Sequence, residues 1–394
     1  MLLKPPFQKP QITIKVLFLQ IISPVDAASF NSALQEYWGM QNIYLTKTAR
    51  QALWLILSSI KPEPGSEVIV SSFTPVVVPL AAMKAGCQPV FCDVIQDGFV
   101  MSPEDAEKKV TKKTIAIVMP YSFGCFSDIE KFTALARKHN LILIEDCAQT
   151  LKGKYKDKYI GFNADFGIWS FGISKNIGSL NGGAFWYHDR HKKGVEKAMA
   201  KFLLNNKPKH NIFDHFRASG VPFINTRFGY WLLRPIIDYY QRGRETSRSI
   251  GYDTAEFDSA LTNFEAALCH RQLNRYDHVY QRRKMNYQIY ENELKNLVKF
   301  PSQPFEFEPD YLYAPILVEQ QVRARLLNQF QNTLVSDINF AYINELDVLK
   351  GISFNTPNRL RVQDEYLLLT LHHSDKLTRK IARQLKLAII KFSK

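Results

Sequence analysis

One lysine in this chain stands where its amine could do chemistry. Lys175 lies in a segment of glycines and small residues between Gly172 and Gly178, directly after the apolar run 166–170. A lysine held away from water there has a lowered pKa, and its neutral amine is a nucleophile that forms an imine with an aldehyde. The alternative is an ordinary lysine in a turn that faces solvent.

A carboxylate follows a second apolar run. Asp146 comes directly after residues 141–145, which predict a buried parallel strand. A half-buried carboxylate without a partner is costly. A protonated pyridine nitrogen is one suitable partner, and the carboxylate would keep that ring cationic so that it acts as an electron sink. The alternative is a carboxylate that caps the next helix.

A phosphate-binding segment is predicted near the start of the chain. Thr48, Ala49 and Arg50 supply a hydroxyl, a small residue and a cation at the beginning of an amphipathic helix. The N–H groups at a helix start bind anions, and Ser170 can add a second hydroxyl. The alternative is a simple N-cap by Thr48.

The elements that position these groups lie between about residues 45 and 190. The predicted strands are Glu67–Ser71, Pro89–Cys92, Ile115–Met119, Leu141–Glu145, Phe166–Ser170 and Gly183–Tyr187. The predicted helices are Thr48–Ile60, Pro75–Ala85, Pro103–Val110 and Asp128–His139. Strands that alternate with helices predict a mainly parallel sheet, and ligands of such sheets bind at the carboxyl ends of the strands.

Several motifs follow one another in the order and spacing of a known family. The matching segments are 48–53 (family pattern SGTAAL), 64–68 (GPGDEV), 71–75 (PSFTF), 85–93 (AGAKPVFVD), 145–149 (EDAAQ) and 170–176 (SF…TKN). From about Phe30 to Asp189, and more weakly to its end, the chain resembles the DegT/DnrJ/StrS family of sugar aminotransferases. These are pyridoxal 5′-phosphate (PLP) enzymes of the fold-type I aspartate aminotransferase superfamily.

This resemblance implies the architecture. The expected fold is α/β, a fold-type I PLP-transferase with a three-layer αβα large domain, a mostly parallel sheet and a smaller C-terminal α+β domain. We expect the N-terminal segment and large PLP-binding domain at 1–200, an aromatic and basic insert or connector at 201–260, and the small domain, beginning with a long helix, at 261–394. The aromatic run 228–240 is interpreted as core or subunit interface, or alternatively as a helix resting on a membrane or partner.

The resemblance also implies which residues bind the cofactor. They are Thr48, Ala49, Arg50, Phe73, Asp146, Gln149, Ser170 and Lys175. Lys175 would form the Schiff base and Asp146 would pair with the pyridinium, so these two are the expected catalytic residues. Gln149 would contact the 3-hydroxyl side of the ring. The residues at the start of the predicted helix Thr48–Ile60, together with Ser170, would bind the phosphate. No metal is expected.

The family's chemistry implies partners as well. Glutamate is the usual amino donor, and the freed Lys175 amine would act as general base and acid in both half-reactions, with ping-pong kinetics. Active sites in the family lie between subunits, so a homodimer is expected. The acceptor would be a keto-sugar.

The sequence departs from the family at several positions. Pro75 stands where an aromatic residue commonly stacks on the cofactor ring, and Phe73 is the candidate substitute. Ala49 replaces the glycine of the phosphate segment. Asp258 and Ala260 replace an asparagine and an arginine in the segment that reaches the partner subunit, and an aspartate there would repel a phosphate.

Composition narrows the class of protein. The 51 Lys and Arg residues exceed the 37 Asp and Glu residues, giving a net charge of +14 that attracts phosphorylated molecules. Basic runs such as 282–284 are interpreted as a solvated face. Nucleic acid is not expected as a partner, and association with a membrane surface has no support beyond the charge.

The cysteines and the N-terminus favour a cytoplasmic protein. Five cysteines without a CxxC pair argue against a disulfide framework. The run 16–22 faintly resembles a signal peptide, but Lys15 and Gln20 interrupt its apolar character. No stretch reaches the roughly 18 apolar residues of a membrane span.

The function predicted from these features is transfer of an amino group from glutamate to a keto-sugar, with a nucleotide-linked sugar as the first hypothesis, in polysaccharide or amino-sugar biosynthesis. A second hypothesis keeps PLP but takes a lipid-linked or carrier-linked acceptor, because the family's acceptor loop has no clear counterpart around 335–344. A third is a degenerate, non-catalytic relative with a binding or regulatory role.

Overall fold

The computed structural model describes residues 25–209, 257–330 and 351–393, with the strand at 335–336 and a few isolated positions between them. The runs 16–22 and 228–240 and the acceptor loop 335–344 lie wholly or almost wholly outside this part of the chain. The interpretations made for them therefore stay predictions.

A seven-stranded sheet forms the centre of the molecule, with strand order β1-β9-β8-β5-β4-β2-β3. Its strands are β1 (Ile43–Thr46), β2 (Glu67–Ser71), β3 (Gln88–Cys92), β4 (Thr114–Pro120), β5 (Ile142–Asp146), β8 (Phe166–Ser170) and β9 (Gly183–Tyr187). All the predicted strands are present to within one residue at each end, and β1 was not predicted. β9 runs antiparallel to its neighbours β1 and β8, and every other pair in this sheet is parallel, so the mainly parallel arrangement is confirmed.

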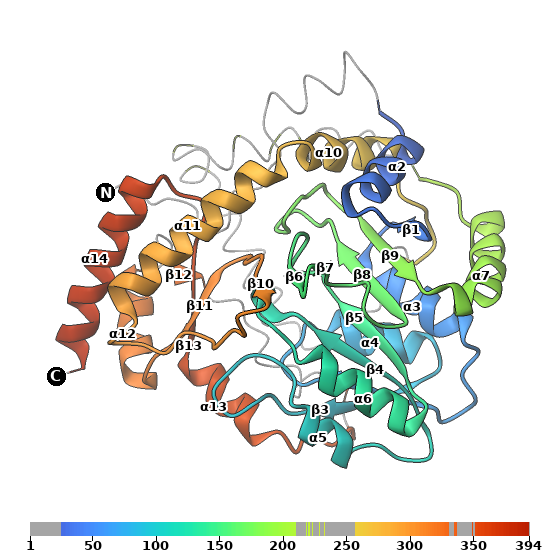
Figure 1. Ribbon diagram of the computed structural model, residues 1–394, viewed down its shortest axis with the longest axis horizontal. Helices are drawn as coiled ribbons and strands as arrows, with labels where there is room; N and C mark the ends of the chain where they lie inside the picture. The colour runs from blue at the N-terminus through green and yellow to red at the C-terminus, as the bar shows by residue number, and fades with distance from the viewer. Residues whose placement is uncertain are drawn as a thin grey trace.

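Helices cover both faces of this sheet (Figure 1). One face carries α3 (Ala49–Ser59), α4 (Val77–Lys84) and α7 (Lys192–Asn205), and the other carries α2 (Ala27–Trp38), α5 (Pro103–Lys108) and α6 (Ile129–His139). Each face has its own buried apolar cluster, containing for example Leu53 and Val70 on the first and Met119 and Phe132 on the second. The three-layer αβα architecture is therefore the observed one.

Local sequence explains where the helices begin and end. The Asp128 side chain accepts a hydrogen bond from the N–H of Lys131 and starts α6, and Asn140 ends it with a left-handed φ of 52°. Ser102 caps α5 through the N–H of Asp105, directly before Pro103 at the first helical position. These caps satisfy N–H groups that a helix cannot satisfy itself.

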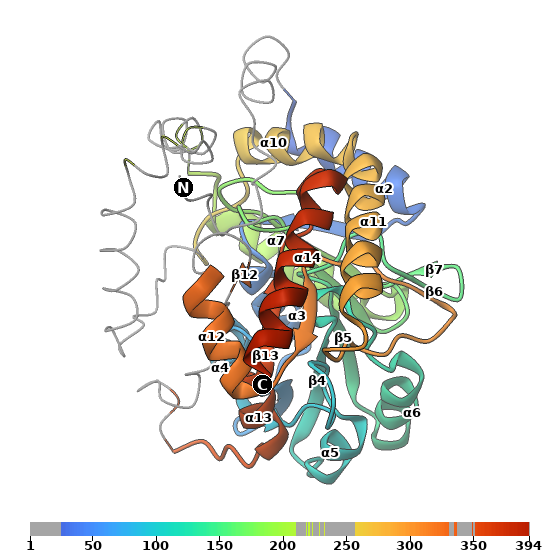
Figure 2. The same ribbon diagram turned by 90° about the vertical axis from the view of Figure 1, so that its left-hand side faces the viewer.

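The C-terminal part builds a smaller antiparallel sheet with strand order β11-β13-β12. Its strands are β11 (Ala314–Leu317), β12 (Val335–Ser336) and β13 (Tyr366–Leu369), and its helices are α11 (Tyr276–Leu294), α12 (Gln320–Phe330), α13 (Pro357–Glu365) and α14 (Asp375–Phe392). Figure 2 shows α14 between α11 and α12. A separate apolar cluster fills this unit, as an α+β domain requires.

The long helix expected from residue 261 is two helices in the structure. A capping box of Thr262 and Glu265 starts α10 (Asn263–Leu273), which packs on α2. The chain then leaves the helical conformation at Arg275, with a φ of −118°, before α11 begins. The helical period continues across this break, which is why the pattern alone did not reveal it.

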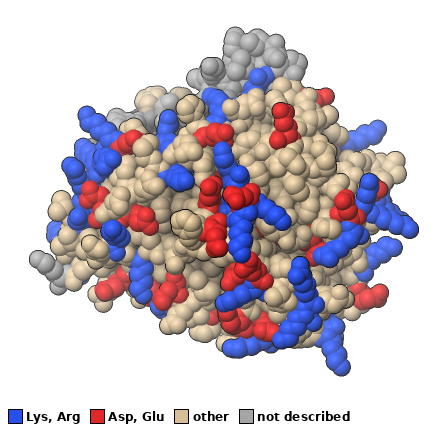
Figure 3. Space-filling view, viewed as in Figure 1, with Lys and Arg blue, Asp and Glu red and all other residues tan. Residues whose placement is uncertain are grey.

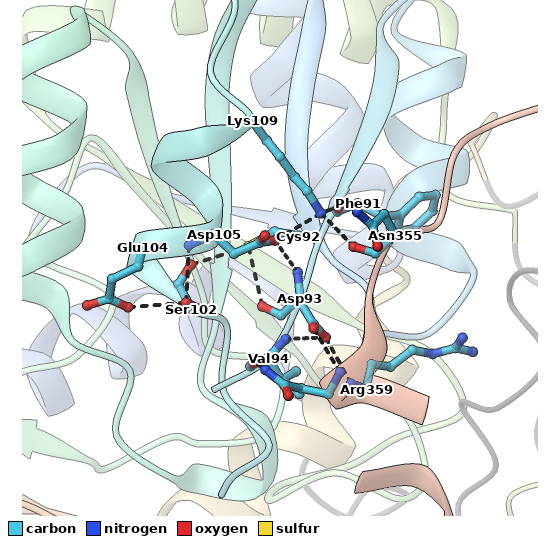
Figure 4. Close-up of polar contacts among 11 residues, drawn as sticks. Phe91, Cys92, Asp93, Val94, Ser102, Glu104, Asp105, Lys109, Asn355 and Arg359 are labelled. Carbon is cyan, nitrogen blue, oxygen red and sulfur yellow. Dashed lines mark hydrogen bonds and ion pairs between the residues drawn. The ribbon is translucent and has the colours of Figure 1, made fainter. Parts of the chain in front are cut away.

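Two further contacts join the N-terminal half of the chain, here residues 25–209, to the C-terminal half, here residues from 257 onward. The hairpin of β6 (Lys154–Tyr155) and β7 (Lys158–Tyr159) pairs with β10 (Phe307–Glu308). At the end of β3, the Asp93 carboxylate accepts hydrogen bonds from the N–H groups of Asn358 (2.9 Å) and Arg359 (2.8 Å) at the start of α13 (Figure 4).

The remaining short elements are the 3-10 turns η1 (Ser122–Gly124) and η2 (Asp189–His191).

Charged side chains of both signs are interspersed on the face shown in Figure 3. Lys131 pairs with Glu104 and Lys138 with Glu107, and all four side chains are well exposed. The interpretation of 282–284 as a solvated basic run needs correction, because Arg283 is only 2% exposed. Within the described residues, no helix is long and apolar enough to cross a membrane.

Candidate active site

A cavity of about 300 Å³ opens at the carboxyl edge of the parallel strands. The residues predicted to bind the cofactor all line it: Thr48, Ala49, Arg50, Phe73, Asp146, Gln149, Ser170 and Lys175. They lie at or just after the carboxyl ends of β1, β2, β5 and β8, so the sheet topology brings together residues far apart in the sequence.

Asp146 is the last residue of β5 and is buried. Its Oδ1 accepts a hydrogen bond from the N–H of Ala148 at 2.9 Å, and within the described residues the carboxylate has no other hydrogen bond. Burial raises the pKa of Asp146, and the nearby charge of Lys175 opposes that rise. The carboxylate thus has one oxygen left for a cationic group in the cavity.

Lys175 lies in the loop that connects β8 to β9. The Lys175 N–H donates to the carbonyl of Gly172 at 2.9 Å and closes a turn, and the side chain lines the cavity. Burial lowers the pKa of the Lys175 amine, and the Asp146 charge raises it by less. The surroundings therefore favour the neutral, nucleophilic amine that the sequence predicted.

The start of α3 is the part of the cavity suited to bind an anion. The Thr48 hydroxyl accepts from the N–H of Gln51 at 3.1 Å, so Thr48 is an N-cap as well as a cavity residue. Ala49 begins the helix without a positive φ, which explains why alanine can stand where the family has glycine. The Arg50 guanidinium lies 5.9 Å from the centroid of the Phe257 ring.

Gln149 and Phe73 are each held by a contact to an aromatic residue. The Gln149 Oε1 accepts from the N–H of Phe123 at 2.6 Å, which leaves the amide NH₂ to serve as a donor. The Phe73 ring is 2% exposed and packs edge-on against Tyr366, with ring centroids 5.4 Å apart. Phe73 and Pro75 both line the cavity.

The donor set fits PLP. A carboxylate with a spare oxygen suits the ring nitrogen, an amine with a lowered pKa suits the aldehyde, and a helix start with hydroxyls and Arg50 suits the phosphate. Within the described residues, no group of three His, Cys, Asp or Glu side chains could hold a metal ion.

Several cavity residues were missed from the sequence. Thr74, Tyr121, Ser122 and Asn181 also line the cavity. Tyr121 follows the end of β4, so the rule that ligands meet strand ends could have found it, although its hydroxyl donates to Glu145 at 2.8 Å. Asn181 had no local signal.

The segment expected to reach a partner subunit lies against the start of α3 in its own chain. The Gln51 amide donates to the carbonyls of Phe257 (3.1 Å) and Ser259 (3.0 Å), and Asp258 between them is exposed. Near the C-terminus, His373 is buried and its ring lies 3.0 Å from the Thr370 hydroxyl.

A solved structure has the same fold. The protein Spr1654 of Streptococcus pneumoniae, known in a PLP-form and a PMP-form, superposes on this chain with TM-scores of 0.78 and 0.79 at 20% identity. The superposition covers 99% of this chain and 98–99% of the other. At that identity the likeness shows the fold.

Two curated relatives share more sequence. GDP-perosamine synthase of Escherichia coli O157:H7 is 27% identical over 285 residues, which span 72% of this chain and 67% of the relative. L-glutamine:2-deoxy-scyllo-inosose aminotransferase of Streptomyces lividus is 29% identical over 293 residues, 74% of this chain and 62% of the relative. The chain thus spans about two thirds of the length of each.

The family assignment rests on a match to almost the whole chain. The sequence model of the DegT/DnrJ/EryC1/StrS aminotransferase family matches residues 20–385. The prediction of a PLP-dependent aminotransferase of fold-type I is therefore confirmed at the level of the family. The chain belongs to the DegT/DnrJ/EryC1/StrS aminotransferase family.

Proposed function

We propose that this chain moves an amino group from glutamate to a keto-sugar, with a nucleotide-linked sugar as the acceptor, and that Lys175 and Asp146 carry the reaction. The supporting observation is that the Lys175 amine and the Asp146 carboxylate line one cavity and influence each other's pKa there. Bound PLP would supply the electron sink for amino transfer.

The residues of this chain divide the work. Asp146 would bind the ring nitrogen and keep it protonated, because a buried carboxylate is stabilised by an adjacent cation. Gln149 would donate to the 3-oxygen of the ring. Arg50, Ser170 and the first turn of α3 would hold the phosphate.

Lys175 would move the proton in both half-reactions. Burial lowers the pKa of the Lys175 amine, which favours its neutral form, and a neutral Nζ could accept a proton from the substrate carbon that bears the amino group. In the same half-reaction Nζ would pass that proton to C4′ of the bound cofactor, and in the second half-reaction it would move a proton in the reverse direction, from C4′ to the acceptor carbon. Ping-pong kinetics are expected because the bound cofactor would hold the amino group between the two half-reactions.

The curated relatives are named for different acceptors. A nucleotide-linked sugar is supported by the relative named GDP-perosamine synthase and by the net charge of +14, which favours a diphosphate. The relative named for 2-deoxy-scyllo-inosose favours a second candidate, a free cyclic ketone with glutamine as donor. A lipid-linked or carrier-linked acceptor remains the third hypothesis from the sequence.

The first experiment tests the cofactor linkage. The purified chain is incubated with PLP, reduced with borohydride and digested, and peptide mass spectrometry locates the attached group. We expect attachment at Lys175, and loss of that attachment in Lys175→Ala with amino transfer reduced by about 10²- to 10⁴-fold. Lys138→Ala, at an exposed ion pair, is the control and should behave like wild type. Attachment elsewhere would contradict the proposal.

The second experiment identifies the substrates. The PLP-loaded chain is mixed with glutamate or glutamine, and its absorbance band shows which donor converts the cofactor. The converted protein is then offered GDP-linked and UDP-linked keto-sugars and 2-deoxy-scyllo-inosose, and recovery of the band identifies the acceptor class. Binding of PLP without conversion by either donor would instead support the non-catalytic hypothesis.

A further inference from the structure

A buried polar cluster lies beside the candidate Schiff-base lysine, outside the cavity residues. It consists of Asn176, Tyr276, Arg283 and Asp310, here called the Asp310 cluster. Asp310 is fully buried, and Arg283 and Asn176 are 2% and 4% exposed. Burying a carboxylate and a guanidinium is costly unless their hydrogen bonds are satisfied, so their retention in the core calls for an explanation.

The two charged residues hold Asn176 from both sides. The Asp310 Oδ2 accepts from the Asn176 Nδ2 at 3.0 Å, while the Arg283 Nη1 donates to the Asn176 Oδ1 at 2.9 Å. The Tyr276 hydroxyl donates to Asp310 at 2.7 Å and accepts from Arg283 at 3.2 Å. The orientation of the Asn176 amide is therefore fixed by its neighbours. Asn176 directly follows Lys175 in the chain.

The same carboxylate also holds the loop that follows β5. The Asp310 Oδ2 accepts from the N–H groups of Leu151 (2.7 Å) and Lys152 (2.8 Å). This loop carries Asp146 at its start and Gln149 two residues before Leu151. One side chain from the C-terminal half thus binds both loops that bear the proposed catalytic groups.

We propose that Asp310 is a positioning residue for Lys175, and that through the Asp310 cluster the C-terminal half sets the placement of the Lys175 amine relative to Asp146. The inference rests on the proposed function. Charge-assisted hydrogen bonds are the strongest available to a protein, and four of them converge on this carboxylate from two loops and one helix. A reactive group misplaced by about 1 Å can lose about 100-fold in rate.

The test is Asp310→Asn, which keeps the shape but removes the charge and one acceptor. In the cofactor-free chain, we expect faster amide hydrogen exchange in residues 171–182 and 147–152, because both loops lose an anchor. On addition of PLP, we expect the rate of covalent attachment at Lys175 to fall by about 10- to 100-fold. The pH midpoint of that attachment should also shift, since the surroundings of the amine change.

Asp277→Asn is the matched control. Asp277 lies on α11 next to Tyr276 and pairs with the Lys152 side chain at 2.5 Å, but its own side chain is 66% exposed. The same substitution therefore removes an exposed contact to the same loop, and such contacts contribute little. Exchange in 171–182 and the attachment rate should match wild type.

A milder pair of variants covers the case in which Asp310→Asn does not fold. Tyr276→Phe removes one hydroxyl from the Asp310 cluster, while Tyr280→Phe removes a hydroxyl one turn later on α11 for which the described residues supply no hydrogen bond. We expect Tyr276→Phe to slow attachment by about 3- to 10-fold, as one net hydrogen bond implies, and Tyr280→Phe to leave it unchanged.

Two results would overturn the inference. A lower melting temperature with an unchanged attachment rate, pH midpoint and loop exchange would assign the Asp310 cluster to stability alone. Equal slowing by Tyr276→Phe and Tyr280→Phe would show that the effect is not specific to the cluster. If the wild-type chain attaches no PLP, the proposed function fails, and hydrogen exchange of the cofactor-free variants still reports whether Asp310 holds the two loops.

Discussion

Two buried aspartates of the large domain differ in their surroundings, and this difference separates a candidate catalytic group from a structural one. Burial raises the pKa of Asp146, and only Lys175 and one N–H oppose it. Burial also acts on Asp165, but His191, the Leu143 N–H and Arg190 together outweigh it and lower the pKa. Asp165 is thus satisfied by its own chain, whereas Asp146 lacks a partner that PLP would supply.

The first prediction concerns the stability of Asp146→Asn in the cofactor-free chain. A carboxyl whose pKa is raised by folding destabilises the native state once pH rises above its ordinary value of 3.8, and this penalty grows until the raised pKa is passed. We therefore expect Asp146→Asn to melt at a higher temperature than wild type near pH 7 and at nearly the same temperature in acid. Amino transfer should be lost in the same variant.

Asp165→Asn supplies the comparison with the opposite sign. Because the folded pKa of Asp165 is lowered, its charge stabilises the native state above pH 3.8, and that stability is lost as pH falls through the lowered value. We expect Asp165→Asn to melt below wild type at pH 7. A melting temperature for Asp146→Asn that is lower than wild type at pH 7 would contradict the assignment of Asp146 as an unsatisfied carboxylate.

Among the elements, the contact between β9 and α3 shapes the proposed phosphate site. Gly183 begins β9 directly beneath the start of α3, and a Cβ built there would lie 2.5 Å from the N atom of Ala49 and from the carbonyl carbon of Thr48. Both are backbone atoms, which cannot move aside as a side chain end can. The absence of a side chain at Gly183 therefore lets the helix start approach the strand.

The second prediction is that Gly183→Ala weakens PLP binding by shifting the start of α3. Overpacking of this kind costs about 1–3 kcal/mol in stability, and the displaced N–H groups should reduce PLP affinity in an equilibrium titration. Gly194→Ala is the control, since its Cβ would meet only the Ser59 carbonyl at 3.2 Å, away from the cavity. Equal PLP affinity for wild type and Gly183→Ala would refute this account of the phosphate site.

In the whole molecule, hydrogen bonds from polar side chains join the N-terminal and C-terminal halves of the chain. Asp93, at the end of β3 and 4% exposed, binds the first N–H groups of α13, and the Lys109 amine reaches the Asn355 carbonyl at 3.2 Å (Figure 4). A carboxylate at a helix start also interacts favourably with the helix dipole. Asp93 therefore acts as a cap supplied from a distant strand.

The third prediction is that Asp93→Ala lowers the free energy of unfolding by about 2–4 kcal/mol, because it leaves buried N–H groups unpaired. Urea denaturation measures this loss. Asp97→Ala is the control: Asp97 also bridges the halves, through Lys299 and Arg361, but it is 57% exposed and should cost less than about 1 kcal/mol. Similar losses in the two variants would show that burial does not decide the strength of these contacts.

The sequence was sufficient for six of the seven strands of the sheet, all except β1, and for eight of the residues that line the cavity. Strands such as β8 and β9 could be located because short apolar runs and the turn residues that bound them depend only on residues close together in the chain. Lys175 and Asp146 could be paired because parallel strands place their carboxyl ends at one edge. The motif spacing that carried the family resemblance is likewise a property of the chain alone.

Other features depend on partners that come from far along the chain. Nothing local distinguishes buried Arg283 from exposed Arg282 and Lys284, since the groups that satisfy Arg283 include Asn176 on a distant loop. Asp310 likewise gives no signal until folding brings the two loops to it. A buried charge is stable only where the tertiary structure supplies its hydrogen bonds, so such residues are recognised from the folded molecule.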